Sequence, residues 1–341
     1  MSGAKFEKHV YGQTKKVKLQ PIEDYDPRPE KYRNKTGTHM KKFLDAVRGK
    51  GLGVSLLLDP STRYWGENTQ PDILPPDLPS IEQLERTIIE FKKSLNVTMQ
   101  QVREIEGKTR SQRHSPEWFA ARRYRITASV FGLIHHRKPD TPPDSLVANI
   151  LEQRQITSPA IKWGIEHEPE ALKAYEEHQH KTGHTGLTVC LVGFHVSTSH
   201  PFLGASPDGG VYDPSTTGEP YGFAEVKCPF KHRDSTPQQA CSDTQFCCEL
   251  TSSGEIHLKK RHPYYCQIQG QMAIGVRPWC DFIIYTPKGI TVERVRYDPE
   301  FWEKDLLPKL EEFYDKCLAP EIISPVRVLG LPLRDLRRRS Q

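Results

Sequence analysis

The sequence has 341 residues, 36% of them hydrophobic, and a formal net charge of +5. A chain of this length can bury one large core beside an accessory segment, and its mean hydropathy of −0.64 describes a rather polar protein. No apolar run approaches about 18 residues and the Lys-bearing N-terminus does not resemble a signal peptide, so we expect an intracellular protein with no membrane partner. The sequence does not distinguish a nuclear from a cytoplasmic location, and the small net charge alone does not indicate a nucleic-acid partner.

The cysteine pattern excludes two further classes of protein. All eight cysteines follow residue 189 and none forms a C-x-x-C pair, so zinc-ribbon and zinc-finger spacings are absent. Without a secretory signal we do not expect a disulfide framework. We therefore predict free thiols, including the adjacent Cys247 and Cys248.

Two segments precede the part of the chain that carries the motifs. Residues 1–79 are polar and rich in Lys and Pro, with one helix predicted in residues 40–47. Residues 80–112 predict a helical arm, because Ser80 and Gln83 match a capping box and an apolar stripe follows at helical spacing. The stripe comprises Ile81, Leu84, Ile88, Phe91 and Leu95. We expect this arm to pack against the rest of the protein.

A basic run leads into the next predicted domain, residues 113–318. Such a run is either a solvated face or a surface that follows the phosphates of a nucleic acid. Ser115 and Pro116 predict the start of a helix that ends among these arginines, and a second helix is expected at 128–134. The run holds a single acid, Glu117, among the basic residues Lys108, Arg110, Arg113, Arg122, Arg123 and Arg125.

The segment 160–177 predicts a long helix. Its core-facing side chains are expected to be Ile161, Trp163, Ile165, Leu172 and Tyr175, and most of its acids to be solvated. The H-x-H-x3-H string that follows, with His178, His180 and His184, resembles a zinc pattern. Because its first two members point to different helix faces, we expect no metal there.

The most informative stretch lies between residues 202 and 230. Two short apolar runs flank a turn-rich loop, which predicts a hairpin with Phe202 and Leu203 in its first strand and residues 223–227 in its second. Strand alternation places Phe223 on the same face as the acid and the base that follow it.

That face carries Glu225 and Lys227, and the hairpin brings Asp208 beside Glu225. An isolated E-x-K pattern is commonly solvent-facing. Two adjacent carboxylates, however, repel unless a cation lies between them, and their oxygens suit Mg²⁺ or Mn²⁺. Lys227 would then orient or deprotonate a metal-bound water, which is chemistry suited to phosphodiester cleavage.

The remaining elements complete the domain. The polar loop 231–256 is predicted to be irregular and either mobile, inserted or substrate-facing. A helix at 263–274 places Tyr264, Gln267 and Gln271 on one stripe, which is either ordinary surface or a set of substrate contacts. Strands are predicted at 188–194, 280–285 and 291–297, a closing helix at 301–317 and a basic tail at 319–341, whose arginines we expect to be solvated.

The spacing of Pro207-Asp208, sixteen intervening residues and Glu225-Val226-Lys227 resembles the PD-(D/E)xK nuclease signature. The flanking motifs resemble, in order and rough spacing, the YqaJ-type viral recombinase family, relatives of the lambda-type exonuclease. These motifs are RITAS at 125–129, Trp163-Gly164 with Glu168-Pro169, ASPDG at 205–209, EVKCP at 225–229 and YYCQIQGQM at 264–272. The similarity covers roughly residues 113–318.

The resemblance implies an α/β fold with a restriction-endonuclease-like core, a mixed central sheet flanked by helices, and a mostly helical N-terminal extension. It implies that Asp208, Glu225 and Glu168 hold Mg²⁺ or Mn²⁺ and act in catalysis with Lys227. The implied substrate-binding residues are Arg125, Ser129, Ser206, Tyr264 and Gln267, with Arg125 and Ser129 matching residues that hold a 5′-terminal phosphate in lambda-type enzymes.

The expected function is a metal-dependent DNA nuclease, and specifically a 5′ to 3′ exonuclease of recombination or repair that acts on linear duplex ends. A single-strand annealing protein and a second copy of the chain are possible partners. Two alternatives stay open: a structure-specific or restriction-like endonuclease, and a nucleic-acid-binding module that has lost catalysis. The joint presence of Asp208, Glu225 and Lys227 argues against the last.

Overall fold

A central five-stranded sheet organises the described part of the chain, which comprises residues 78–152 and 158–339 of a computed structural model. The strand order is β10-β9-β6-β5-β2, in which β6 and β9 run parallel and the other neighbours antiparallel. The mixed α/β class expected from the sequence is confirmed. The strands are β2 (Thr188–Cys190), β5 (Gly209–Tyr212), β6 (Tyr221–Lys227), β9 (Trp279–Thr286) and β10 (Gly289–Arg296).

The chain divides into two units, Met1–Leu74 and Pro75–Gln341, and the described residues belong to the second. The helix predicted in residues 40–47 lies outside the described residues. None of the described helices is long and apolar enough to cross a membrane.

The strand that pairs with β6 is not the one that the sequence predicted. The predicted partner, β4 (Leu203–Ala205), belongs to a separate three-stranded sheet of order β1-β4-β3, with β1 at Ile126–Thr127 and β3 at His195–Val196. The actual partner is β5, in which Gly209 lies opposite Ala224. The prediction was wrong because the small residues of β5 are typical of turns, whereas here they form a buried strand.

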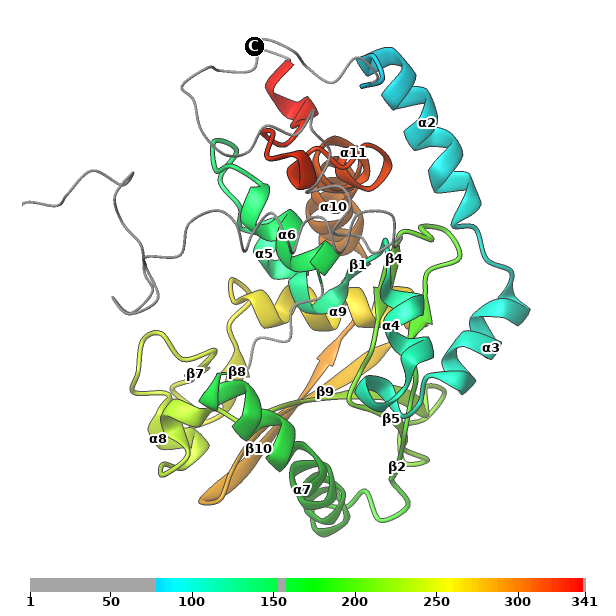
Figure 1. The fold of residues 1–341 in the computed structure, drawn as a ribbon. Coiled ribbons are helices and arrows are strands. Elements are labelled where there is room, and N and C mark those ends of the chain that lie inside the picture. The colour runs from blue at the N-terminus through cyan, green and yellow to red at the C-terminus, as the bar shows by residue number, and fades with distance from the viewer. Residues whose placement is uncertain (1–77, 153–157, 340–341) are drawn as a thin grey trace, which may run out of the picture. The chain divides into compact units, whose positions relative to one another are not determined.

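Two helices cover opposite faces of the central sheet: α7 (Pro159–Lys181) and α9 (Pro263–Gly275) (Figure 1). Phe223 packs with Ile268 and Met272 of α9, whereas Ala224 and Val226 pack with Ala171 and Tyr175 of α7. The predicted alternation of β6 is thus confirmed, and residues 223 and 225 share the face that α9 covers.

The predicted helical arm is confirmed as α2 (Ile81–Ser94) and α3 (Met99–Lys108), each with a capping box. Leu84 and Ile88 are buried in one apolar cluster with the C-terminal helices, and the Lys92 ammonium lies 2.8 Å from a carboxylate oxygen of Asp315. Figure 1 shows α2 beside these helices. They comprise α10 (Leu307–Phe313) and α11 (Ala319–Ile323), with π-helical turns at Phe301–Leu306 and Tyr314–Leu318.

Short helices link the arm to α7. They are a 3-10 turn at Gln112–His114, α4 (Pro116–Arg122), a 3-10 turn at Ala128–Val130, α5 (Phe131–His135) and α6 (Asp144–Glu152). Ser115 caps α4 by accepting a hydrogen bond of 3.3 Å from the Trp118 amide, as its sequence predicts.

Three regions differ from the expectation. The segment 231–256 is not irregular, since it holds a 3-10 turn at Phe230–His232, α8 (Pro237–Ala240), and β7 (Cys248–Leu250) paired with β8 (Ile256–Leu258). The predicted 188–194 strand ends at Cys190, and Leu191 is exposed. In the tail, which has 3-10 turns at Arg327–Leu329 and Leu336–Arg339, the Arg334 guanidinium donates to the Pro79 carbonyl at 2.8 Å rather than being solvated.

Candidate active site

The β5–β6 hairpin positions Asp208 at its open end. The Asp208 amide donates to the Ala224 carbonyl (3.1 Å), and its carboxylate oxygen Oδ2 accepts from the Val226 amide (2.8 Å). Asp208 is therefore fixed against β6 by its backbone and its side chain. Its second oxygen, Oδ1, receives no hydrogen bond from the described residues.

Glu225 lies beneath this point and is almost fully buried, with 2% of its surface exposed. Its Oε1 accepts from the Lys227 ammonium and the Gln267 amide, and its Oε2 accepts from the Gln271 amide at 2.7 Å. Both glutamines come from α9. The predicted amide stripe is thus a buried set of donors to the motif glutamate and not an ordinary surface.

The third acid, Glu168, comes from α7, on the other side of the hairpin. Its Oε2 accepts from the Arg113 guanidinium at 3.2 Å. Gly164, one turn earlier, leaves the helix surface open here, and the exposed Ile161 and Ile165 line the same opening. These two isoleucines were predicted to face the core, but they face a pocket instead.

That pocket has a volume of about 480 Å³. Asp208, Glu168 and Lys227 line it, together with residues of the 231–247 segment such as His232 and Phe246. Part of the segment 231–256 thus forms the wall of this pocket.

Two carboxylates of the pocket, Asp208 and Glu168, have raised pKa values. Burial raises the pKa of Asp208 well above its ordinary value, and the neighbouring Glu225 and Glu168 carboxylates add to the effect. Burial also raises the pKa of Glu168, against the lowering effect of Arg113. Carboxylates gathered in this way lack sufficient positive charge, which a cation would supply.

The Lys227 ammonium lies 4.6 Å from the centre of the Tyr264 ring. Its burial acts to lower the pKa, but the Glu225 and Asp208 carboxylates outweigh burial and raise the pKa above its ordinary value. Lys227 therefore stays protonated and positively charged in this structure. It can donate hydrogen bonds to water or to a phosphate oxygen.

A divalent cation fits this donor set. Mg²⁺ and Mn²⁺ prefer carboxylate oxygens, and Asp208 offers a free oxygen at the pocket beside Glu168. Glu225 is the least free of the three acids, because donors occupy both of its oxygens. The position of Asp208 and Glu168 at one opening, with Glu225 buried beside them, is the observation that favours a cation here.

A second polar cluster includes Ser206, two residues before Asp208 in the chain, whose hydroxyl accepts from the Trp118 indole at 2.8 Å. The Arg122 guanidinium lies 4.0 Å from the centre of the Trp118 ring and donates to the Thr127 hydroxyl (3.3 Å), which is 3.2 Å from the Ser129 hydroxyl. We call these five residues the Arg122 cluster. The cluster thus contains three hydroxyl groups and one guanidinium.

Arg122 has no carboxylate partner among the described residues, and burial lowers its pKa to about 10. A guanidinium that lacks a carboxylate partner keeps the capacity to form charge-assisted hydrogen bonds with an anion. The Arg122 cluster is therefore a candidate anion site.

The structure does not bring Arg125 into this cluster. Its guanidinium donates to the backbone carbonyls of Pro201 (2.8 Å), Ala121 (2.7 Å) and Leu95 (3.5 Å). Arg125 thus joins the arm to the domain. Other members of the basic run are also used internally, since Arg110 pairs with Glu106 at 2.9 Å.

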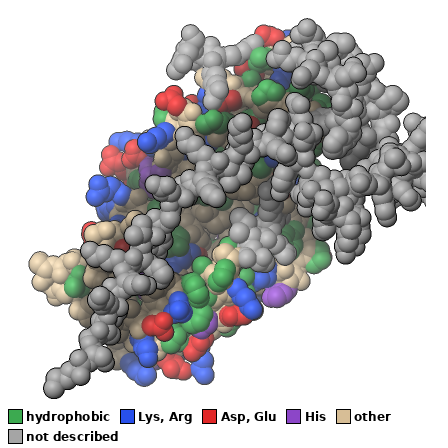
Figure 2. All heavy atoms as spheres, turned by 60° about the vertical axis from the view of Figure 1, so that its left-hand side comes forward, with side chains coloured by type: hydrophobic (Ala, Val, Ile, Leu, Met, Phe, Trp, Pro, Cys, Tyr) green, Lys and Arg blue, Asp and Glu red, His purple; other side chains and the backbone are tan. Residues whose placement is uncertain are grey.

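Charged side chains of both signs are interspersed on the part of the face that Figure 2 leaves visible. The visible part of that face therefore shows no broad surface of positive charge.

Sequence reasoning missed three contributors: Arg122, Arg113 and Gln271. Arg122 lies four residues after Trp118 in α4, a spacing that places a cation over an aromatic ring on one helix face. Gln271 was recognised on the stripe with Gln267 but not as a site residue. No local signal connects Arg113 with Glu168, because 55 residues separate them.

Residues 117–277 match the family model described as "YqaJ-like viral recombinase domain". This segment is a YqaJ-like viral recombinase domain. The family resemblance predicted from the motifs is confirmed. The YqaJ-like domain begins within α4 and ends after α9, so it contains the three acids, Lys227 and the Arg122 cluster.

Several solved structures are similar to this chain. An alkaline exonuclease (LHK-Exo) from Laribacter hongkongensis is 24% identical with a TM-score of 0.44, and the match covers 63% of this chain and 96% of that one. The Shutoff and Exonuclease Protein of Kaposi's sarcoma-associated herpesvirus is 15% identical, with a TM-score of 0.39 and coverage of 65% and 72%. A phage-related exonuclease from Haemophilus somnus is 15% identical, with a TM-score of 0.35 and coverage of 59% and 96%. No curated protein sequence matches the chain.

Proposed function

We propose that this protein is a metal-dependent deoxyribonuclease that degrades linear duplex DNA from 5′-phosphorylated ends. The observation that carries the proposal is the gathering of Asp208, Glu168 and Lys227 at one pocket of a YqaJ-like domain, with Glu225 buried beside them and bonded to Lys227. Acids and a lysine in this arrangement suit phosphodiester hydrolysis.

Each residue has a distinct role in the proposed site. Asp208, Glu225 and Glu168 would hold Mg²⁺ or Mn²⁺, which would supply Lewis-acid chemistry at the scissile phosphate. Lys227 orients the attacking water or a phosphate oxygen by donating a hydrogen bond. Gln267 orients Glu225, and Tyr264 covers Lys227.

The Arg122 cluster supports the choice of an exonuclease. A guanidinium and hydroxyls without a carboxylate are suited to a phosphate monoester, which a guanidinium binds through charge-assisted hydrogen bonds. Ser206 joins this cluster to Asp208, two residues later in the chain. An enzyme that cuts within a duplex has no need to sense a terminal phosphate.

The test is cleavage of end-labelled linear duplex DNA and of covalently closed circular DNA, with Mg²⁺ and with a chelator. The proposed exonuclease degrades the linear DNA, leaves the circle intact and is inactive with the chelator. Cutting of the circle would instead establish the endonuclease. Binding without cleavage of either DNA would establish a module that has lost catalysis.

Asp208→Asn should abolish cleavage while leaving DNA binding intact or tighter, because the substitution removes a negative charge that repels phosphate. Glu166→Gln is the matched control, since Glu166 is an exposed acid on α7 that pairs with Lys162. Cleavage by the Asp208 variant at the wild-type rate would refute the assignment of the site.

A further inference from the structure

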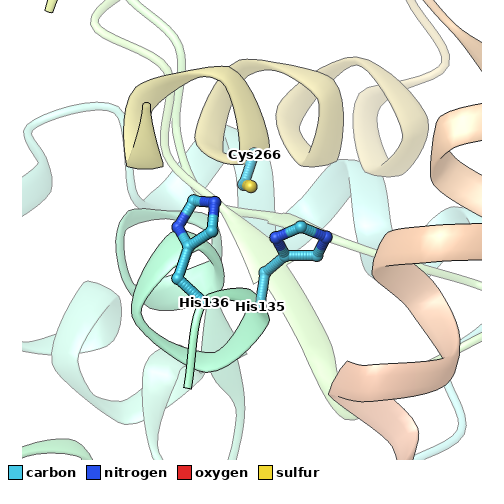
Figure 3. A group of neighbouring side chains, drawn as sticks. All are labelled: His135, His136 and Cys266. Carbon is cyan, nitrogen blue, oxygen red and sulfur yellow. The ribbon is translucent and has the colours of Figure 1, made fainter. Parts of the chain in front are cut away.

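A second group of metal-ligating side chains lies outside the pocket, between α5 and α9. It consists of His135 at the end of α5, His136 directly after it, and Cys266 in the second turn of α9. One ligand atom from each residue lies within 4.8 Å of the other two. Figure 3 shows the two imidazole rings on either side of the Cys266 sulfur.

These separations are close to those of a bound transition metal. With Zn–N near 2.0 Å and Zn–S near 2.3 Å, tetrahedral ligand atoms lie roughly 3.3–3.6 Å apart. The three ligand atoms therefore need to close by about 1 Å, which rotation of side chains can supply. His136 is exposed and free to make that rotation.

One buried nitrogen atom of the group lacks a hydrogen-bond partner. The His135 Nδ1 atom is buried and has no hydrogen-bond partner among the described residues. The Cys266 thiol is fully buried. A buried polar nitrogen without a partner is unfavourable in a folded protein, and a metal ion would satisfy it.

The two elements that carry the ligands are pressed together, so the cluster is held in place by the fold. A Cβ atom on Gly132 of α5 would lie 2.5 Å from the Cα atom of Pro263, the first residue of α9. A Cβ atom on Gly270 would lie 2.3 Å from the Phe131 ring. Glycine at both positions allows this approach, and His135, His136 and Cys266 lie along the same junction.

We propose that His135, His136 and Cys266 bind one Zn²⁺ ion, with water in the fourth position. Imidazole and thiolate ligands suit zinc and other borderline metals, and not the hard cations that carboxylates prefer. The charges that act on His135 are mixed, because Lys309 donates to the His135 carbonyl at 3.1 Å and Asp305 has the opposite electrostatic effect.

The ion would connect α5 to α9 through Cys266, which packs in the same apolar cluster as Phe131 of α5. Cys266 directly precedes Gln267, which donates to Glu225. Zinc at the junction therefore stabilises the helix that orients Glu225, without contacting substrate.

The test uses the full chain with Asp208→Asn, which weakens cation binding at the pocket, and measures metal binding directly. Titration with Co²⁺ reports a thiolate ligand through a sulfur-to-metal charge-transfer absorption band, and Zn²⁺ should displace the Co²⁺. We expect one equivalent of Co²⁺ to produce the band and Zn²⁺ to raise the melting temperature.

Exposed His136 gives the decisive variant, because His136→Ala should not disturb folding. It should weaken Co²⁺ binding by about tenfold or more and reduce the gain in melting temperature. Cys266→Ala should remove the band. The controls are His178→Ala on α7 and Cys190→Ala, an exposed thiol on β2, and neither should change the titration.

Three results would overturn the proposal. They are the absence of a charge-transfer band at one equivalent, equal Co²⁺ affinity for His136→Ala and its parent, and loss of the band with Cys190→Ala. None of these results bears on DNA cleavage, so the zinc site and the proposed nuclease activity succeed or fail separately.

Discussion

At the scale of single residues, the two cations of the site have different surroundings. Lys227 is surrounded by carboxylates and donates to Glu225, whereas Arg122 lies over Trp118 with no described carboxylate partner. The protein supplies carboxylates for the first cation, whereas the second can pair with an external anion. Their proposed roles in catalysis and in end recognition follow from this difference.

Lys227→Ala should slow cleavage by about two orders of magnitude or more, in the range seen when a group that assists proton transfer or orientation is lost. Lys227→Arg should recover little of that rate, because the planar guanidinium cannot reproduce the geometry of an ammonium between Glu225 and Tyr264. Single-turnover rates at saturating DNA measure the effect. Normal rates in both variants would show that Lys227 is not catalytic.

The preference for a 5′-phosphate should depend on Arg122 and not on Arg125. Losing a hydrogen bond to a charged group costs about 1.5–3 kcal/mol, so Arg122→Ala should reduce the ratio of rates on 5′-phosphate and 5′-hydroxyl duplexes by about ten- to a hundredfold. Arg125→Ala should lower the melting temperature, since three carbonyls lose their donor, and leave the ratio unchanged. If Arg125→Ala reduced the ratio and Arg122→Ala did not, Arg125 would be the residue that recognises the 5′-phosphate.

At the scale of elements, α9 connects the motif glutamate to the core. Its Gln267 and Gln271 hold both oxygens of Glu225, while Gln269, on another face, donates to the Arg296 carbonyl at 2.9 Å. The helix therefore presents one amide pair to the site and a third amide to the sheet edge.

Gln271→Leu and Gln269→Leu form a matched pair of substitutions. Each leaves a buried acceptor without its donor, so each should lower the free energy of unfolding by about 1–3 kcal/mol. Only Gln271→Leu should raise the Mg²⁺ concentration that gives half-maximal cleavage, because only Gln271 orients Glu225. An equal metal dependence in the two variants would assign Gln271 a purely structural role.

At the scale of the whole molecule, a buried ion network joins the sheet to α7 on the side away from α9. The Arg294 guanidinium bonds Asp281 (2.8 Å) and Asp213 (2.9 Å), and Asp281 also accepts from the Tyr175 hydroxyl at 2.6 Å. Burial acts to raise the pKa of Asp213, but hydrogen bonds from Ser215, Arg294 and His184 outweigh it and hold that pKa well below its ordinary value.

A depressed carboxylate pKa stabilises the fold above the unfolded-state pKa, and this stability is lost as the pH falls toward the folded-state value. Arg294→Met should therefore lower the free energy of unfolding by roughly 3–5 kcal/mol at neutral pH, because two buried carboxylates lose their partner. The difference from wild type should narrow below about pH 4, where unfolded aspartates take up protons.

Urea unfolding at several pH values measures this difference. Arg296→Met is the control, two residues along the same strand, because its partner Glu219 is half exposed and the pair should contribute less than about 1 kcal/mol. If the difference in the free energy of unfolding between wild type and Arg294→Met stayed constant across the acid range, Asp213 would not be the origin of that difference.

Much of the fold is determined by local sequence. The capping boxes at Ser80 and Thr98, the Ser115 cap and the period-two alternation of β6 all depend on residues within a few positions of one another. The motif residues Asp208, Glu225 and Lys227 were found for the same reason, since their spacing and the family resemblance both lie in the linear sequence.

Only the tertiary structure decided which segments meet. The choice of β5 over β4 as the partner of β6, the exposure of Ile161 and Ile165 to a pocket, and the use of the α9 amides as donors to Glu225 all arise between segments distant in sequence. Arg122 and Arg125 are three residues apart and chemically identical, yet one lies over Trp118 and the other bonds three backbone carbonyls. Local periodicity specifies which side chains share a face, whereas long-range packing alone specifies what that face contacts.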